Sequence, residues 1–417
     1  MKKTWYLILK CFFCLILVFC RPGAAQEFKL EISGPEVIKI PIAVPEFQGP
    51  LPLAHELANV ARNDFTLQLV FDVLGENFIA PEAKAFQALG VQYLFQGKVV
   101  QAGRYVRTEF YLYDIIRSRT LLARAYRGPI KAARYMVHRF VDLAVKKITD
   151  VRGVAYSRVA YVQRTAHGDQ LLVSDFDGYH RVVVAKREGF ILYPRFSPDG
   201  RYLAFVSYRN GRPEIDILDL TTGKRRTLCA FEGLNAYPVW HPSGKKLVVT
   251  LSIDGNPDLY LIDLNGRILR RLTHGEGVNT GGSFSPDGQN LAFVSDRSGR
   301  PQIYILNLLT GAVRRLTFYG SYNTSPSWSP TGDRIVYAGM VSGHFALFTI
   351  SPEGGEPVQI TRDGDFESPV FSPNGRLILC QARTAKGRGL YLLLANGAAQ
   401  VFYQVGDLRY PAWIRLP

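Results

Sequence analysis

The stretch Phe284-Ser285-Pro286-Asp287-Gly288 decides the fold, because variants of it recur from residue 196 to the end of the chain. We call each copy an anchor. The anchors are Phe196–Gly200, Trp240–Gly244, Phe284–Gly288, Trp328–Gly332 and Phe371–Gly375, with a degenerate sixth at Pro411-Ala412-Trp413. Their aromatic residues stand at positions 196, 240, 284, 328, 371 and 413, so the steps are 44, 44, 44, 43 and 42 residues. A period of about 40–45 residues is typical of a four-stranded propeller blade.

Each anchor predicts a tight hairpin between two strands. Proline fixes φ at the second turn position, a short polar residue suits the third, and Gly suits the fourth. After the anchor at Phe284, further strands are expected at Leu291–Val294, Gln302–Asn307 and Ala312–Thr317. Four short strands therefore fill one period. The density of Gly, Pro and β-branched residues argues against a pair of helices of the same length.

The two ends of the repeat region complement each other. The first repeat has strands at 158–162, 171–174 and 181–185 but no anchor, so it lacks a first strand. The chain end, Arg409–Arg415, has a first strand and nothing after it. We therefore expect an all-β propeller of six blades over residues 151–417, in which the C-terminal strand completes the first blade and closes the ring.

Residues 26–150 predict a small α+β domain in which helices cover one sheet. Helices are expected at Pro52–Arg62, Pro81–Leu89 and Lys131–Ile148. Strands are expected at Phe71–Leu74, Gln92–Gln101, Val106–Ile115 and Thr120–Tyr126. One apolar stripe runs along the last helix and predicts its inner face. It consists of Ala133, Met136, Val137, Phe140, Ala144 and Ile148.

Residues 1–25 predict a secretory signal peptide. Two lysines near the start precede the almost wholly apolar run Trp5–Phe19, and Gly23–Ala25 offers small residues for cleavage. The run is too short to favour a membrane anchor. A bulky Phe19 stands where lipid attachment at Cys20 would need a small residue. We expect an exported, periplasmic chain that does not span the membrane after cleavage.

The charge and the cysteines limit the choice of partners. Loss of the signal removes four of the 50 Lys and Arg residues, which leaves 46 against 35 Asp and Glu and a net charge of +11. Such a charge suits acidic partners or anionic envelope surfaces, and equally a solvated basic exterior. Nucleic acid is not expected, because no compact Arg/Lys motif is present. The remaining Cys229 and Cys380 fall in different repeats, so no disulfide is expected.

The residues that could carry chemistry form no catalytic pattern. The sequence contains no Gly-x-Ser-x-Gly, Walker loop or Rossmann glycine set. His55-Glu56 lacks the second His of a zinc helix, and the seven His residues are dispersed. Turn chemistry explains acidic pairs such as Asp175 and Asp177 better than calcium binding does. We therefore expect no catalytic residue, no metal and no cofactor.

A short polar loop precedes each first strand and predicts a binding surface. First strands line the channel of a propeller, so these loops ring one of its mouths. Such a ring suits a peptide or protein partner. For any single Asn in it, an equal alternative is that the side chain caps a turn. The residues also leave open an exported propeller that binds or cleaves a small ligand, peptide or glycan in its channel.

The chain after the signal resembles the TolB family, the periplasmic propeller proteins of the Tol-Pal system. The resemblance rests on Ile40–Phe47, Arg158–Val162, Val173–Tyr179, Ser295–Tyr304, the anchors and the closing Tyr410–Trp413. The stretch Ser-Asp-Phe-Asp-Gly-Tyr within Val173–Tyr179 is more specific than the anchors, which occur in many propellers.

The resemblance implies a non-enzymatic, monomeric scaffold. In that family the propeller mouth binds the peptidoglycan-associated lipoprotein Pal, and the N-terminal arm binds the inner-membrane protein TolA. The system keeps the outer membrane intact and helps it follow constriction at cell division. Matching loops carry the Pal contact onto Leu234, Asn235, Tyr237, Asn279 and Thr280. The ring of loops adds Asn323, Thr324, Phe366, Glu367 and Arg409. An arm at residues 26–37 carries the TolA contact onto Glu27, Phe28, Lys29, Leu30 and Ile32.

Overall fold

The computed structural model describes residues 38–417 except 76–82, 187–188 and 276. The expected signal peptide and N-terminal arm lie outside the described residues. Within the described part, no helix combines the length and the apolar character needed to cross a membrane.

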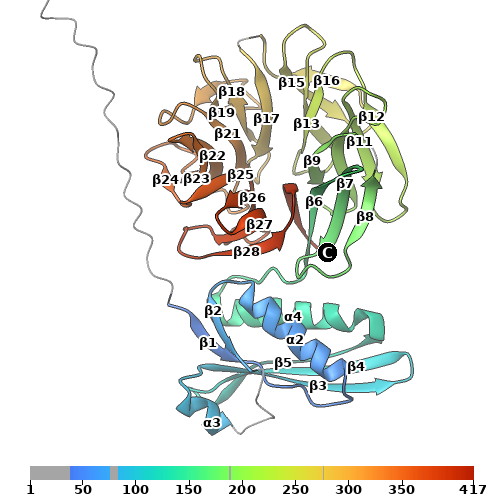
Figure 1. Cartoon of the computed structure of the whole chain (residues 1–417), viewed down its shortest axis with the longest axis vertical. Coiled ribbons are helices and arrows are strands. Elements are labelled where there is room, and N and C mark those ends of the chain that lie inside the picture. Colours follow the sequence, from blue (N-terminus) through green and yellow to red (C-terminus); the bar gives the residue numbers. More distant parts are fainter. Residues whose placement is uncertain (1–37, 76–82, 187–188, 276) are drawn as a thin grey trace, which may run out of the picture. The chain divides into compact units, whose positions relative to one another are not determined.

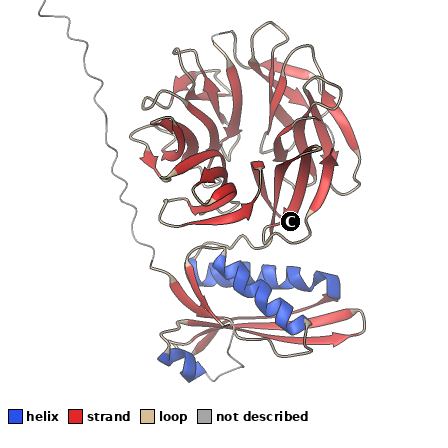
Figure 2. Ribbon diagram, viewed as in Figure 1, coloured by secondary structure: helices blue, strands red, loops and turns tan. Residues whose placement is uncertain are grey.

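The N-terminal part is a five-stranded sheet with its two longer helices on one face and the short helix Ala83–Ala88 on the other (Figures 1 and 2). The strand order is β2-β1-β3-β4-β5, with β1 parallel to β2 and β3 and the remaining pairs antiparallel. The strands are β1 (Ile40–Ala43), β2 (Phe71–Leu74), β3 (Tyr93–Ala102), β4 (Tyr105–Asp114) and β5 (Arg119–Pro129). The helices are α2 (Leu53–Thr66), α3 (Ala83–Ala88) and α4 (Ala133–Thr149), with a 3-10 turn at Ile130–Ala132 before α4.

Aromatic side chains fill the space between this sheet and its helices. Phe95 of β3 stacks on Phe140 of α4 with ring centroids 5.1 Å apart, and Phe110 of β4 lies 5.4 Å from Phe140. All three side chains are fully buried. Gly97 makes room for Phe47, because a Cβ there would lie 2.6 Å from the Phe47 ring.

The helical stripe expected from the sequence is confirmed. Its members in this core are Ala133, Met136, Val137, Phe140 and Ala144, with Ile148 partly buried against them. The helix expected to end at Arg62 continues to Thr66, because Phe65 extends its buried face and packs 5.1 Å from Phe71.

Six four-stranded antiparallel sheets form the propeller. Numbered along the chain and given from first to fourth strand, the blades have the following bounds. Blade 1 is β29 (Leu408–Arg415), β6 (Ser157–Thr165), β7 (Gly168–Asp175) and β8 (Val182–Lys186). Blade 2 is β9 (Ile191–Phe196), β10 (Tyr202–Ser207), β11 (Glu214–Asp219) and β12 (Arg225–Cys229). Blade 3 is β13 (Asn235–Trp240), β14 (Lys246–Leu251), β15 (Asp258–Asp263) and β16 (Ile268–Arg271).

The remaining three blades repeat this order. Blade 4 is β17 (Asn279–Phe284), β18 (Asn290–Ser295), β19 (Gln302–Asn307) and β20 (Val313–Arg315). Blade 5 is β21 (Asn323–Trp328), β22 (Ile335–Val341), β23 (His344–Ile350) and β24 (Val358–Gln359). Blade 6 is β25 (Gly364–Phe371), β26 (Leu377–Thr384), β27 (Gly387–Leu394) and β28 (Gln400–Val405). The six-bladed architecture expected from the period is confirmed.

The anchors form the expected hairpins. In blade 4, the Ser285 hydroxyl donates to the Asp287 carboxylate, and the Gly288 N–H donates to the Ser285 carbonyl at 2.9 Å. Gly288 has a φ of 73°, in the left-handed region that favours glycine. A Cβ there would also lie 2.7 Å from Nε2 of His241 in the preceding anchor. Glycine is therefore needed both for the turn and for the contact between blades.

The fourth strand of blade 4 is shorter than expected. β20 ends at Arg315, because the Thr317 hydroxyl accepts the Ile303 N–H at 2.9 Å in place of a backbone carbonyl. Thr273 and Thr361 do the same for Leu259 and Leu347. Both cysteines of the propeller, Cys229 and Cys380, are free and buried, as expected.

The C-terminal strand closes the ring. β29 pairs antiparallel with β6, with Trp413 opposite Val159. The Trp413 indole N–H donates to the Ser157 hydroxyl at 2.8 Å, and its ring stacks on Phe176 at 4.6 Å. Trp413 is only 7% exposed. The first blade is therefore assembled from both ends of the repeat region.

We expect the Trp413→Ala variant to unfold at a markedly lower temperature, with a loss of about 3–5 kcal/mol in the free energy of unfolding, because a buried indole is removed from the closing blade. Circular dichroism during heating measures this. Leu309→Ala is the control, because Leu309 is 90% exposed. Equal melting temperatures for both variants would contradict closure through β29.

Candidate functional site

The first strands surround the central channel. Each of β9, β13, β17, β21, β25 and β29 contacts the next, and β29 returns to β9. Every one of them has a break in its pairing with the second strand. Three residues before the anchor aromatic, the backbone takes a positive φ in all six blades. These residues are Tyr193 (52°), Tyr237 (50°), Gly281 (60°), Ser325 (53°), Ser368 (51°) and Tyr410 (52°).

This repeated β-bulge is a feature of the blade. A non-glycine residue held at such a φ costs roughly 1–3 kcal/mol, so the fold must over-determine it. Proline follows the bulge residue in five blades, and Gly282 follows it in the sixth. A bulge redirects the side chains on either side of it. The bulge therefore decides what each first strand presents to the channel.

Three tyrosines at the bulge meet in the channel. Tyr193 stacks on Tyr237 with centroids 4.1 Å apart and lies 4.6 Å from Tyr410. The Tyr193 hydroxyl donates to the Tyr237 hydroxyl at 3.0 Å. Burial raises the pKa of all three phenols, so they are neutral at physiological pH. We call these residues the tyrosine cluster. Aromatic side chains of this kind are enriched at protein interfaces.

The other three blades carry only small residues at the bulge. These are Gly281, Ser325 and Ser368. The bulge positions around the channel are therefore unequal, with tyrosine in blades 1 to 3 and a small residue in blades 4 to 6. Tyr237 is the one member of the tyrosine cluster that was predicted from the sequence. A Tyr-Pro pair three residues before the anchor aromatic, at 193, 237 and 410, was the signal for the other two.

A cavity of about 530 Å³ lies next to the tyrosine cluster and brings together two predicted residues, Glu367 and Arg409, with Tyr410. Arg409 forms an ion pair with Asp407 at 2.8 Å, and Arg383 pairs with Asp365 at 3.1 Å. Burial, with the nearby charge of Asp365, raises the pKa of the Glu367 carboxyl. The cavity therefore offers both signs of charge beside an aromatic surface.

Four of the predicted contact residues are buried, which corrects the expectation that they contact a partner directly. Asn235, Asn279 and Phe366 are fully buried and Asn323 is 2% exposed. All four stand five residues before the anchor aromatic, where the strand directs side chains into the blade. Phe366 packs against Tyr391 in the core of blade 6.

The three asparagines fasten their loops, as the turn-capping alternative predicts. The Asn235 amide donates to the Phe231 carbonyl at 2.7 Å. The Asn279 amide donates to Asp258 of the preceding blade at 2.8 Å. The Asn323 amide donates to the side-chain Oε1 of Gln302, also in the preceding blade, at 2.8 Å. These side chains therefore hold the mouth loops in place.

The other six predicted residues are partly exposed and remain candidates for contact. They are Leu234, Tyr237, Thr280, Thr324, Glu367 and Arg409. The five residues proposed for the arm, Glu27, Phe28, Lys29, Leu30 and Ile32, lie outside the described residues. Their contact with a partner stays a prediction.

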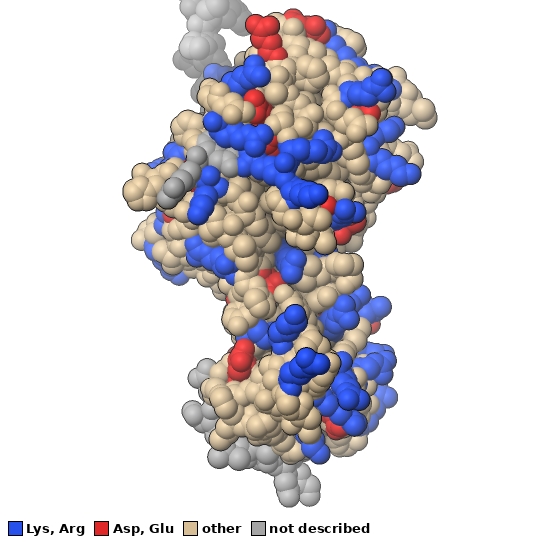
Figure 3. Space-filling view, turned by 90° about the vertical axis from the view of Figure 1, so that its right-hand side faces the viewer, with Lys and Arg blue, Asp and Glu red and all other residues tan. Residues whose placement is uncertain are grey.

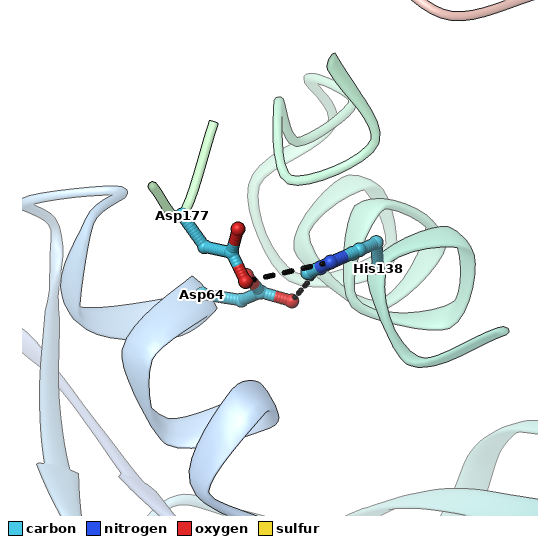
Figure 4. Close-up of side chains that lie close together, drawn as sticks. All are labelled: Asp64, His138 and Asp177. Atoms are coloured by element: carbon cyan, nitrogen blue, oxygen red, sulfur yellow. Dashed lines mark hydrogen bonds and ion pairs between the residues drawn. The ribbon is translucent and has the colours of Figure 1, made fainter. Parts of the chain in front are cut away.

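One group among the described residues has the composition of a metal site: Asp64 of α2, His138 of α4 and Asp177 in the turn after β7 (Figure 4). His138 Nδ1 lies 2.7 Å from Asp64 and Nε2 lies 3.6 Å from Asp177. Arg134 also forms an ion pair with Asp177. Arg134 pairs with the same Asp177 oxygen that faces His138, so the residues fit a buried charge network better than a metal centre.

This network joins the helices to the first blade. Burial alone would lower the pKa of His138, but the charges of Asp64 and Asp177 outweigh it and raise that pKa. Asp177 also accepts the Tyr179 N–H at 3.0 Å, as its expected turn role requires. The imidazole therefore lies between a carboxylate of α2, to which it is hydrogen-bonded, and a carboxylate of the propeller 3.6 Å away.

Two family models match the chain. One describes the TolB beta propeller domain and matches residues 145–416, and the other describes the TolB amino-terminal domain and matches residues 28–121. The crystal structure of TolB from Acinetobacter baumannii is similar with a TM-score of 0.82 and 29% identity, covering 92% of this chain and 98% of that one.

Two curated relatives are both named Tol-Pal system protein TolB. The Tol-Pal system protein TolB of Syntrophus aciditrophicus is 35% identical over 245 residues, which is 52% of this chain and 54% of the relative. The Tol-Pal system protein TolB of Nitrosococcus oceani is 33% identical over 245 residues, which is 55% of this chain and 56% of the relative. The chain thus spans about half the length of the curated relatives it matches.

We expect His138→Gln to lower the free energy of unfolding most at low pH. Because the folded-state pKa of His138 is raised, its contribution is full below its ordinary pKa of about 6.5 and is lost as the pH rises through the folded value. The contribution is about 1.4 kcal/mol for each pH unit by which the folded-state pKa exceeds the ordinary one. Chemical denaturation across pH 5.5–9 measures it. His167→Gln, at an exposed histidine, is the control. A stability difference independent of pH would contradict the charged bridge.

Proposed function

The chain belongs to the TolB family, and we propose that it is a non-enzymatic, periplasmic scaffold of a Tol-Pal system whose propeller mouth binds a Pal-like lipoprotein. Through the same system it would support outer-membrane integrity and constriction at cell division. The proposal rests on the structure of the mouth. There the tyrosine cluster borders a cavity lined by both acidic and basic side chains, and asparagine hydrogen bonds hold the surrounding loops in place.

The geometry of the mouth suits a protein partner. Interfaces commonly concentrate their binding energy in a few buried aromatic and Arg residues, surrounded by polar contacts. The tyrosine cluster supplies stacked rings that lose little freedom on binding. Thr280, Thr324, Glu367 and Arg409 supply partly exposed polar groups around it. The asparagine bonds pre-organise the loops, which lowers the entropy cost of association.

The second proposed partner is a TolA-like inner-membrane protein, bound through the N-terminal arm. The match to the amino-terminal family model begins at residue 28, within that arm. This supports the view that the arm corresponds to a segment found in the TolB family. The arm contact would use Glu27, Phe28, Lys29, Leu30 and Ile32. Binding at the arm and at the propeller mouth would give one monomeric chain two separate partners.

We expect Thr280→Asp to weaken binding of a purified Pal-like lipoprotein, without its lipid, at least tenfold. The new carboxylate would be desolvated in the mouth without a partner. Isothermal titration calorimetry measures the dissociation constant. Gln289→Asp is the matched control, because it adds the same charge at the exposed residue that follows the anchor of the same blade. We expect it to change the constant less than twofold.

A pull-down from envelope extract tests the choice of partner. Recovery of a Pal-like lipoprotein by the unaltered chain, and its loss with Thr280→Asp, supports the proposal. Recovery of no lipoprotein, together with saturable binding of a sugar or peptide in the channel, would instead support a ligand-binding propeller. Equal weakening by Thr280→Asp and Gln289→Asp would contradict the assigned mouth.

A further inference from the structure

Four arginines line a second cavity, away from the propeller mouth. It has a volume of about 570 Å³. Its walls come from β5, α4, the segment that follows α4 and the last residues of the chain. The lining residues are Arg124, Tyr126, Arg139, Leu143, Arg152, Tyr156, Arg415, Leu416 and Pro417. No Asp or Glu of the described part of the chain lines this cavity.

None of these arginines forms an ion pair with a carboxylate of the described residues. Arg139 donates to the Tyr156 hydroxyl at 3.0 Å, and more weakly to the Pro417 carbonyl oxygen at 3.5 Å. Arg415 donates to the Gly153 carbonyl at 2.7 Å, and Arg124 to the Ala123 carbonyl at 3.1 Å. These contacts orient three of the four guanidinium groups, and none of them is made to a side-chain carboxylate.

The acidic group that bears on this set is Asp142. It is fully buried on α4, and its carboxylate accepts the Ala155 N–H at 2.7 Å. Burial raises the pKa of Asp142 to about 6, although Arg415 and Arg152 lower it. A carboxylate that turns inward to a backbone N–H cannot also reach a ligand in the cavity. The cavity thus presents four guanidinium groups, and no side-chain carboxylate of the described residues lines it.

The chemistry of the walls selects the kind of ligand. Guanidinium groups bind phosphate oxygens in pairs, with a geometry that lysine cannot match. Several of them around one cavity exceed what a single carboxylate, with two oxygens, can use. Tyr126, Tyr156 and the neighbouring leucines add apolar walls that can hold an organic group. The Arg139 guanidinium carbon lies 4.6 Å from the centre of the Tyr156 ring, and this stacking favours one orientation of the guanidinium group.

We propose that this cavity binds a phosphorylated ligand, with the phosphoryl group held by Arg124, Arg139 and Arg152 and its organic part against Tyr126 and Tyr156. The site goes beyond the proposed scaffold function and does not rest on it, because it shares no residue with the propeller mouth. A soluble phosphate compound and a lipid headgroup present the same anion to these arginines. The basic excess of the chain, visible on the face drawn in Figure 3, favours the approach of either.

Calorimetric titration with pyrophosphate tests the site directly. We expect saturable binding by the exported chain at low salt. The double variant Arg124→Ser/Arg139→Ser should raise the dissociation constant at least tenfold. Arg104→Ser/Arg127→Ser is the matched control, because it removes two exposed arginines that lie outside the cavity, of which Arg104 also lies over a tyrosine ring. We expect less than a twofold change. Unchanged melting temperatures would show that all variants fold.

Vesicle sedimentation distinguishes the two sources of the phosphoryl group. If the cavity binds a lipid headgroup, vesicles with phosphatidylglycerol should retain the chain, vesicles of neutral phosphatidylcholine should not, and pyrophosphate should compete. If neither vesicle retains it while pyrophosphate binds, the ligand is a soluble phosphate compound. Absence of saturable pyrophosphate binding, or equal weakening in both double variants, would overturn the proposal.

Discussion

The contact between the glycine of one anchor and the proline of the preceding anchor is the constraint on which the propeller depends. A Cβ on Gly288 would lie 3.4 Å from Pro242, and three further pairs of consecutive anchors show the same relation. The pairs are Gly244 with Pro198, Gly332 with Pro286 and Gly375 with Pro330, at 3.9, 3.7 and 3.5 Å. Each turn therefore sets the position of the next. Blades of 42–44 residues keep this contact in register from blade 2 to blade 6.

The distance of a residue from the anchor aromatic determines its burial and its backbone conformation at the other end of the first strand. Counting back from the anchor aromatic, the fifth residue is buried in every blade and the third takes the left-handed φ. At the fifth position, asparagine fastens a loop in three blades. At the third, tyrosine or a small residue decides how full the channel is. The anchor is thus structural, and the residues before it give the mouth its chemistry.

The period, the blade count and the closing strand could be predicted because they depend on local turn chemistry repeated at a fixed spacing. The apolar stripe of α4 could be predicted for the same reason, since one helix carries it. Burial of Phe366 and the asparagines could not, because a bulge two residues later changes which face each side chain takes. The tyrosine cluster and the arginine cavity unite residues far apart in the chain, so spacing alone could not reveal them. The arm contacts fall on residues outside the described part and stay predictions.

The proposed function assigns different roles to the two ends of each first strand. The loops before the first strands form the partner-binding mouth, and the anchors after them hold the blades of the ring together. Hydrogen exchange of the chain with and without a Pal-like lipoprotein tests this division most directly. We expect binding to slow exchange at the amides of Thr280, Thr324 and Glu367 and to leave the anchor amides of Gly288 and Gly332 unchanged. Protection confined to the anchors, or none at the mouth, would contradict it.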